Sequence, residues 1–154
     1  MALVIRKSSI AEMVASPNLE CLLEEYAIES AIHGLPHPKA KIDLYEQLEA
    51  VGVLYAICAF WDGELVGFIL IVSPVNPHYS AKISTTESYF VAKAYRKTGA
   101  GKKLRQAAET YAKEIGALGL LISAPIGSLL AHVLELDKGY KETNRVFFKG
   151  FNGK

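Results

Sequence analysis

The sequence predicts an α/β domain in which a mixed, twisted sheet of about six to seven strands carries helices on both faces. Three observations predict this fold. Two apolar runs, 53–61 and 65–72, are joined by Asp62-Gly63, a dipeptide typical of a type I′ hairpin turn. A helix expected over 99–115 has apolar residues at i, i+3, i+4, i+7, i+8 and i+11. Predicted strands and helices are mixed along the rest of the chain.

The remaining elements follow from local signals, taken in chain order. A short strand is expected over 3–6, and Ser9 with Glu12 has the capping-box spacing that opens a short helix. Ser16 as N-cap and Pro17 at the first helical position predict a longer helix that ends at Gly34. Further expected elements are a helix over 39–51, a strand over 82–91, a buried strand over 118–123, a helix over 127–136 and a closing strand over 140–149.

Length and composition restrict the class of protein. The chain has 154 residues, and we expect one domain over 1–154. A net charge of +1 argues against a nucleic-acid partner. Cys21 and Cys58 form no C-x-x-C pair, so neither a disulfide scaffold nor a metal site is expected. The apolar runs are too short to span a bilayer and no secretory signal pattern opens the chain, so we expect a cytoplasmic protein with no membrane contact.

A basic, glycine-containing turn separates the strand over 82–91 from the helix that follows. It contains Arg96, Gly99 and Gly101 in the spacing R-x-x-G-x-G. Free N–H groups and the positive dipole end of a helix bind phosphate, and glycines let the backbone approach it closely. The P-loop and dinucleotide fingerprints both fail here, because each lacks a required glycine. The turn is therefore a candidate pyrophosphate site, although glycines that only shape a strand–turn–helix would give the same pattern.

With the preceding strand and Tyr95 before the arginine, this segment resembles the coenzyme A-binding segment of the GNAT superfamily of N-acetyltransferases. The element order over nearly the whole chain is similar to that family, as is Gly139-Tyr140 near the end. The resemblance implies a GNAT-like fold in which the fourth and fifth strands, 82–91 and 118–123, splay apart around acetyl-coenzyme A. It also implies that an N–H near Phe90 or Val91 polarises the thioester carbonyl. The residues expected to bind the coenzyme are Tyr89, Phe90, Val91, Arg96, Lys97, Thr98, Gly99, Ala100, Gly101 and Lys102.

The same resemblance implies direct attack of an amine on the thioester, with Glu87 as the candidate base. Period-2 alternation would place Glu87 on one face with Thr85, Tyr89 and Val91. A strand glutamate that faces solvent or pairs with a lysine is the competing interpretation. The family's usual tyrosine acid has no counterpart in 133–137, and His132 is either a substitute or a structural residue.

The acceptor is expected among the first two helices and the loop before the fourth strand, where the substrate candidates are Glu24, Glu25, Tyr26 and Tyr79. The acidic helix face is either a solvated surface or a wall that attracts a cationic substrate. The expected function is acetyl-coenzyme A-dependent N-acetylation of a primary amine, on a small molecule or a protein. The alternatives are a non-catalytic, regulatory coenzyme A-binding module and a domain with no ligand. The closing strand could also pair across a homodimer.

Overall fold

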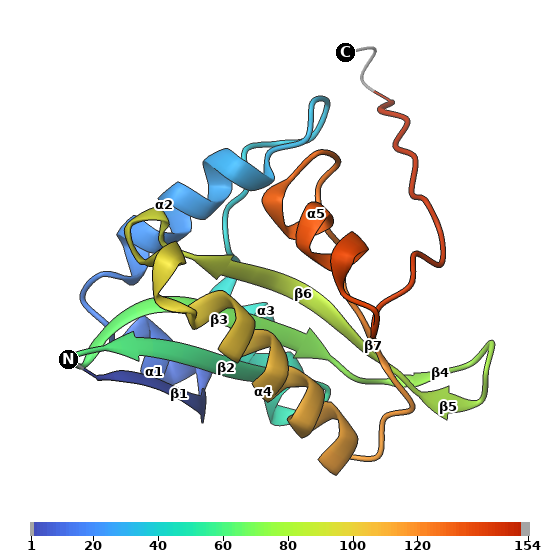
Figure 1. Ribbon diagram of the computed structural model, residues 1–154, viewed down its shortest axis with the longest axis horizontal. Coiled ribbons are helices and arrows are strands. Elements are labelled where there is room, and N and C mark those ends of the chain that lie inside the picture. Colours follow the sequence, from blue (N-terminus) through green and yellow to red (C-terminus); the bar gives the residue numbers. More distant parts are fainter. Residues whose placement is uncertain (1, 152–154) are drawn as a thin grey trace.

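The structure is a computed structural model that describes residues 2–151 (Figure 1). Its elements, in chain order, are β1 (Leu3–Ser8), α1 (Ile10–Val14), α2 (Leu19–Ser30), α3 (Ile42–Ala50), β2 (Leu54–Trp61), β3 (Glu64–Val72), β4 (Val75–Asn76), β5 (Ala81–Lys82), β6 (Ser84–Val91), a 3₁₀ helix (Lys93–Thr98), α4 (Ala100–Glu114), β7 (Leu120–Leu121) and α5 (Leu129–Leu136). The expected mixed α/β architecture is confirmed.

The main sheet has the strand order β1-β2-β3-β6-β7 and is mixed, because only the β6–β7 pair is parallel. Strands β4 and β5 form a separate two-stranded hairpin. The turn between β2 and β3 has positive φ at both Asp62 (49°) and Gly63 (84°), as the predicted type I′ turn requires. The expected six to seven strands are thus divided between a five-stranded sheet and this small hairpin.

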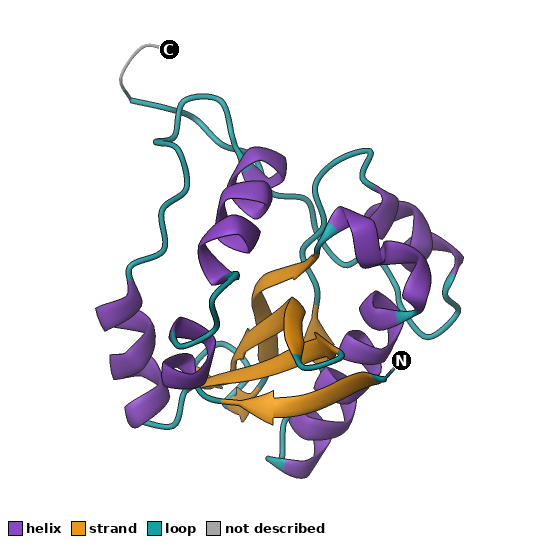
Figure 2. Ribbon diagram, turned by 90° about the vertical axis from the view of Figure 1, so that its left-hand side faces the viewer, coloured by secondary structure: helices purple, strands orange, loops and turns teal. Residues whose placement is uncertain are grey.

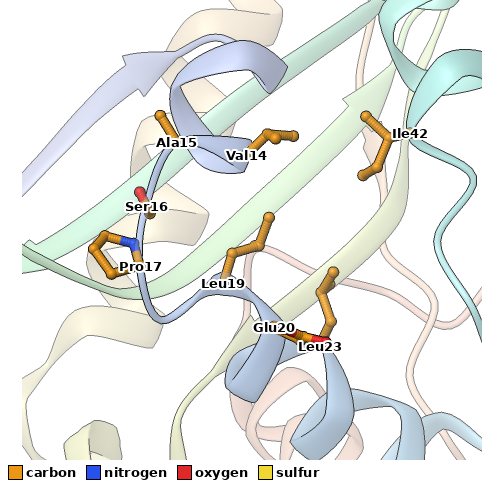
Figure 3. A pocket seen from close by; sticks show the side chains of 8 residues that line it. All are labelled: Val14, Ala15, Ser16, Pro17, Leu19, Glu20, Leu23 and Ile42. Carbon is orange, nitrogen blue, oxygen red and sulfur yellow. The ribbon is translucent and has the colours of Figure 1, made fainter.

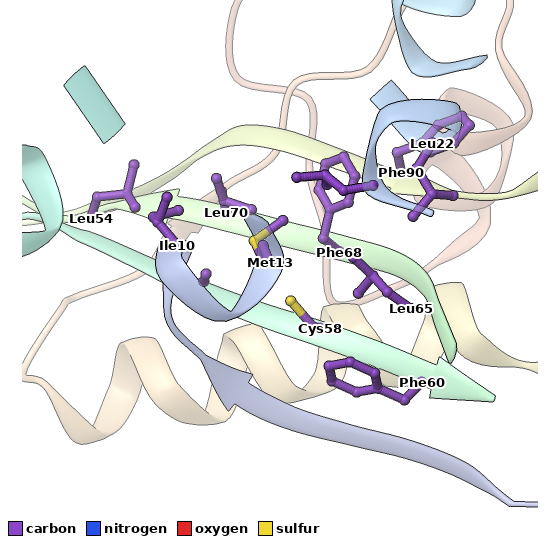
Figure 4. Packing of buried hydrophobic residues seen from close by; sticks show 12 residues of the cluster. Ile10, Met13, Leu22, Leu54, Cys58, Phe60, Leu65, Phe68, Leu70 and Phe90 are labelled. Carbon is purple, nitrogen blue, oxygen red and sulfur yellow. The ribbon is translucent and has the colours of Figure 1, made fainter. Parts of the chain in front are cut away.

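Helices cover both faces of the sheet (Figures 1 and 2). Helices α1 and α2 pack on one face over Phe68, Leu70 and Phe90, and Tyr45 of α3 lies against the same cluster (Figure 4). Helix α4 covers the other face through a buried stripe that includes Leu104 and Ala108. That stripe is the apolar periodicity predicted from the sequence, and burying it is the main force that holds α4 on the sheet.

Several boundaries differ from the prediction, and α2 ends at Ser30 rather than at Gly34. Helix α2 has Asn18 rather than Ser16 as its N-cap, because the Asn18 side chain donates to the Leu65 carbonyl and the Ser16 hydroxyl donates back to Glu12 O. The strand expected over 118–123 is reduced to Leu120–Leu121. No strand forms over 140–149: this segment finds no neighbouring strand in the described chain, and β propensity alone does not hold a strand. The capping role of Ser9 is confirmed, since its hydroxyl accepts from Glu12 N–H at 3.0 Å.

Candidate functional site

Strands β6 and β7 pair only at one end. Their parallel register joins Ser84 with Leu120 and Thr85 with Leu121, and Ser123 N–H then donates to the Thr86 hydroxyl at 3.1 Å. Beyond this point the two segments part, so most of β6 has an unpaired backbone edge on the β7 side. An unpaired strand edge can bind an extended ligand as an added strand would.

Two residues of β6 direct their backbone groups to this open edge. Ala92 N–H donates to Val66 O, and Phe90 lies opposite Phe68, so the even-numbered residues bond to β3. Alternation in an antiparallel ladder then turns Tyr89 and Val91 toward β7. Arg96 Nε confirms this for Val91 by donating to its carbonyl at 2.9 Å. Of the two N–H groups expected to face the ligand, that of Val91 lies on the correct side and that of Phe90 does not.

A β-bulge interrupts β6 at Glu87. Leu70 pairs with Ser88 and Ile71 with Thr86, which leaves Glu87 as the extra residue. The expected alternation across this point is therefore wrong. Tyr89 and Val91 pack on the α4 face, whereas Glu87 meets Tyr45 on the α2 and α3 face. The inserted residue reverses the alternation of side chains between the two faces. Glu87 therefore lies on the opposite face of the sheet from Tyr89 and Val91.

Glu87 is exposed and hydrogen-bonded from α3. The Tyr45 hydroxyl donates to Glu87 Oε2 at 2.8 Å. Burial, and then the bond to Glu87, raise the pKa of Tyr45 well above its ordinary value, so this hydroxyl stays protonated and remains a donor. Burial and the nearby Glu87 charge also raise the pKa of Tyr26, whose ring packs on Phe90 at 5.3 Å. A carboxylate held this way can accept a proton from a substrate that reaches the same face.

The turn after β6 presents the start of α4. Gly99 adopts φ 87° and ψ 2°, and α4 begins at the next residue. The Thr98 hydroxyl donates to Tyr95 O at 2.6 Å and accepts from Ala100 N–H at 3.3 Å. The amides of Gly101 and Lys102, in the first turn, lack intrahelical acceptors. With the exposed side chains of Lys97 and Lys102 beside them, these amides make a site suited to phosphate.

The Arg96 side chain is bonded to other groups of the protein. Its guanidinium bonds to both carboxylate oxygens of Glu29, at 2.7 and 2.9 Å, and also to the Val91 carbonyl. Glu25 accepts from Lys93 N–H at 3.0 Å, at the start of the 3₁₀ helix. Two acidic residues of α2 thus fix the turn between β6 and α4. Whether Arg96 also contacts a phosphate stays a prediction.

The other substrate candidates are not brought together. Glu24 lies 3.7 Å from His37 in the loop after α2, and Tyr26 is near Glu87. Tyr79 is exposed on the β4–β5 hairpin, which Figure 1 places at the far end of the sheet from α2. Of these candidates, only Tyr26 therefore lies close to Glu87. Tyr45 was missed by the sequence analysis, although the helical spacing of Ile42, Tyr45 and Leu48 places it on the inward face of α3.

A second missed group links α4 to the end of α5. Arg105 is 5% exposed, bonds to Asp137 Oδ2 at 3.1 Å and lies over the Tyr140 ring at 5.4 Å. The Tyr89 hydroxyl donates to the Gly101 carbonyl, and burial raises the pKa of Tyr89 to about 12 against the opposing effect of Arg105. The only sequence signal for Arg105 is its place on the apolar stripe of α4. His132 is exposed on α5.

Two cavities of the protein lie away from these residues. Two cavities of about 390 and 370 Å³ flank the α1–α2 turn, where both are lined by Ala15, Ser16 and Pro17 (Figure 3). Neither includes an expected site residue. Within residues 2–151, no group of three or more His, Cys, Asp or Glu side chains could hold a metal ion. In the same part of the chain, no helix is both long and apolar enough to cross a membrane.

Gly99→Ala is expected to weaken coenzyme binding beyond its effect on stability. A side chain at φ +87° costs about 1–2 kcal/mol, and relieving that strain would move the amides of the turn. Gly116→Ala is the matched control, because Gly116 has φ +86° and equally open surroundings at the other end of α4. Both variants should melt at a similar, lower temperature, but only Gly99→Ala should raise KM for acetyl-coenzyme A. Equal KM values would show that the turn does not bind the coenzyme.

The open edge of β6, followed directly by the N-terminus of α4, is an arrangement suited to an extended ligand that carries phosphate. Comparisons with known proteins agree. Residues 21–125 match the model of the acetyltransferase (GNAT) family, and the chain belongs to this family. It is an acetyl-coenzyme A-dependent N-acetyltransferase.

The individual proteins to which the chain is similar have low sequence identity to it. The chain is 28% identical over 103 residues to aminoglycoside N(6')-acetyltransferase type 1 from Stenotrophomonas maltophilia, a match over 65% of this chain and 67% of that protein. Aminoglycoside acetyltransferase AAC(6')-Iy, solved with a coenzyme A bisubstrate analogue, has a TM-score of 0.74 at 18% identity over 97% of both chains. A ribosomal-protein-alanine N-acetyltransferase from Brucella melitensis has a TM-score of 0.71 at 20% identity over 97% of this chain and 98% of that one.

Proposed function

We propose that the chain acetylates a primary amine on a cationic small molecule, with Glu87 as the base. The observation that carries this proposal is the position of Glu87, which lies on β6 two residues before the open edge at Tyr89 and Val91. A free alkylamine is protonated at neutral pH, since its pKa is about 10.4 in the case of lysine, so a base must remove a proton before attack. The Tyr45 hydroxyl orients the carboxylate for this step.

Charge on the same face favours a cationic acceptor. Helices α2 and α3 carry Glu20, Glu24, Glu25, Glu29, Asp43, Glu46 and Glu49 and no lysine or arginine. Glu25 and Glu29 bond to the turn between β6 and α4, but Asp43 and Glu46 of α3 are exposed to solvent. A concentration of negative charge raises the local concentration of a cationic substrate. The similarity to an aminoglycoside acetyltransferase supports the same acceptor class.

The coenzyme-binding residues follow from the geometry above. Acetyl-coenzyme A, when bound, supplies the acetyl thioester. The Val91 N–H, at the open edge, would donate to the thioester carbonyl oxygen, and the bond from Arg96 to the Val91 carbonyl holds the following peptide in place. The amides of Gly101 and Lys102, with the Lys97 and Lys102 side chains, would hold the phosphates. No tyrosine or buried histidine of α5 is assigned to protonate the thiolate, and a thiol of pKa about 8.5 leaves without one.

The proposal also covers the domain organisation, location and partners of the chain. We infer a single domain over 1–154, a cytoplasmic location, a homodimeric assembly and no nucleic-acid partner. A protein amine is the less favoured acceptor, because the acidic helices select for cationic charge rather than for an extended peptide.

A thermal melt with acetyl-coenzyme A tests the coenzyme site. A ligand at about 100 times its Kd that binds only the folded state adds roughly 2.7 kcal/mol of stability. For a domain of this size we expect Tm to rise by about 5–10 °C. Aminoglycosides and simple primary amines are then screened for thiol release. No shift at millimolar ligand would contradict the proposed site, and a shift without turnover on any amine would favour a non-catalytic binding module.

A further inference from the structure

The Arg96 side chain joins helix α2 to the end of strand β6. Its Nη2 donates to both carboxylate oxygens of Glu29, at 2.7 and 2.9 Å, and its Nε donates to the Val91 carbonyl at 2.9 Å. The guanidinium carbon also lies 5.2 Å from the centroid of the Phe90 ring. A planar guanidinium makes such a set of contacts at once, whereas a lysine ammonium is a single point of charge.

The backbone at Val91 is held from both sides of β6. Its carbonyl accepts from Arg96 on the open edge, and the next N–H, that of Ala92, donates to Val66 O at 2.9 Å on the β3 side. Strand β7 pairs with β6 only at the other end of the strand. Arg96 therefore supplies, at this position, the hydrogen bond that a neighbouring strand would give.

Glu29 lies at a position that its own helix does not favour. It is in the last turn of α2, where a carboxylate meets the negative end of the helix dipole, and that turn has no basic residue to offset it. Its favourable partner is Arg96, 67 residues later in the chain. A residue that breaks a local rule in this way is typical of a functional position. The contact with Arg96, rather than helix stability, therefore accounts for Glu29.

We propose that Glu29 is a positioning residue for acetyl transfer: it holds the Arg96 guanidinium against the Val91 carbonyl, and this fixes the Val91 N–H where it polarises the thioester. The inference deepens the proposed function and rests on it, because it takes the Val91 N–H as the donor to the thioester carbonyl. Such a donor stabilises the developing charge only if its position is fixed before the reaction. A displacement of about 1 Å in an active site can lower the rate about 100-fold.

Helix α2 holds the same region at further points. Glu25 accepts from Lys93 N–H at 3.0 Å, at the start of the 3₁₀ helix that lies beside α2 (Figure 1). Tyr26, the next residue of α2, packs on the Phe90 ring at 5.3 Å and lies near Glu87. One helix thus contacts both the turn after β6 and the face that carries the proposed base. The relative position of thioester and base therefore depends on α2.

Glu29→Gln gives the first test. The amide keeps the size of the side chain but loses the charge and one of the two oxygens that accept from Arg96. We expect kcat at saturating amine to fall by about tenfold, because the Val91 N–H is displaced rather than removed. KM for acetyl-coenzyme A should stay within about twofold, since its own buried stripe fixes α4 to the sheet.

Glu12→Gln is the matched control. Glu12 of α1 bonds to Arg6 of β1 through both carboxylate oxygens, as Glu29 does to Arg96. The side chains of Glu12 and Arg6 are 38% and 46% exposed, and those of Glu29 and Arg96 are 43% and 31% exposed. The control pair does not touch β6, so its loss should leave kcat unchanged. Equal kcat values for the two variants would overturn the proposal.

Reversal of the two charges separates a stabilising ion pair from a positioning contact. A double variant with Glu29→Arg and Arg96→Glu keeps opposite charges at the two positions but has no donor at residue 96 for the Val91 carbonyl. We expect its melting temperature to return toward that of the wild type while kcat stays as low as in Glu29→Gln. Recovery of kcat would show that the ion pair alone is needed, and the proposal would be wrong.

Amide hydrogen exchange of the free protein gives a measurement that does not depend on activity. Exchange over residues 91–96 should be at least about fivefold faster in Glu29→Gln and unchanged in Glu12→Gln. Faster exchange with unchanged kcat would give Glu29 a structural role only and overturn the proposal. A wild-type chain without turnover would contradict the proposed function, and with it this role. An active wild type whose kcat survives Glu29→Gln would contradict this inference alone.

Discussion

Glu87→Gln is expected to lower kcat by about 100-fold or more, because removal of a positioned general base typically costs two to four orders of magnitude in rate. The amide keeps the size of the side chain and can still accept from the Tyr45 hydroxyl at the 2.8 Å position. It cannot take a proton from an ammonium group at neutral pH. Steady-state thiol release at saturating amine measures the change.

Coenzyme affinity separates this effect from misfolding. Because Glu87 lies on the α2 and α3 face and Val91 on the α4 face, the variant should keep the thermal shift given by acetyl-coenzyme A. Glu64→Gln, on an exposed strand position of β3, is the matched control and should keep full activity. An active Glu87→Gln variant would remove Glu87 as the base. A wild-type chain that binds coenzyme but acetylates no amine would favour a regulatory module.

Asp137→Asn is expected to lower the free energy of unfolding by about 3 kcal/mol, since loss of one partner leaves a buried charge uncompensated. The Arg105 side chain is only 6% exposed, whereas that of Asp137 is 36% exposed, which places the cost at the lower end of the usual range. Asparagine can still accept from Gly139 N–H through its carbonyl oxygen. Urea denaturation measures the change, and Tm should fall by about 6–12 °C.

The exposed ion pair between Glu142 and Arg145 is the control for this loss of stability. Glu142→Gln removes the ion pair with Arg145. The side chain of Glu142 is 64% exposed and that of Arg145 is 78% exposed, so the free energy of unfolding should change by less than about 1 kcal/mol. Equal effects of the two substitutions would mean that Arg105 is not held by Asp137. A larger loss of stability in Asp137→Asn would establish that the Arg105–Asp137 contact holds the end of α5 against α4.

Patterns that act over a few residues determined much of the fold. The Asp62-Gly63 turn forms because both residues tolerate positive φ, and it sets the register of the two pairs next to it, before a bulge between Ala59 and Phe60 shifts the rest. Helix α4 forms where an apolar stripe repeats with the helical period, and the glycine before it takes the left-handed conformation that glycine adopts without strain. The same local signals located the candidate phosphate-binding turn, because that prediction depends on backbone amides rather than on distant side chains.

Contacts between distant segments decided the rest. The bulge at Glu87 depends on how β6 pairs with β3, so the strand sequence alone predicted a single alternating face. Arg96 meets Glu29 and Arg105 meets Asp137 across 67 and 32 residues, and no local pattern identifies such partners. The segment over 140–149 has strand-like residues but no neighbouring strand in the described chain. The sequence by itself determined which backbone shapes were available, and only the tertiary structure decided which edges and charges found a partner, because pairing requires groups that the chain brings together only when it folds.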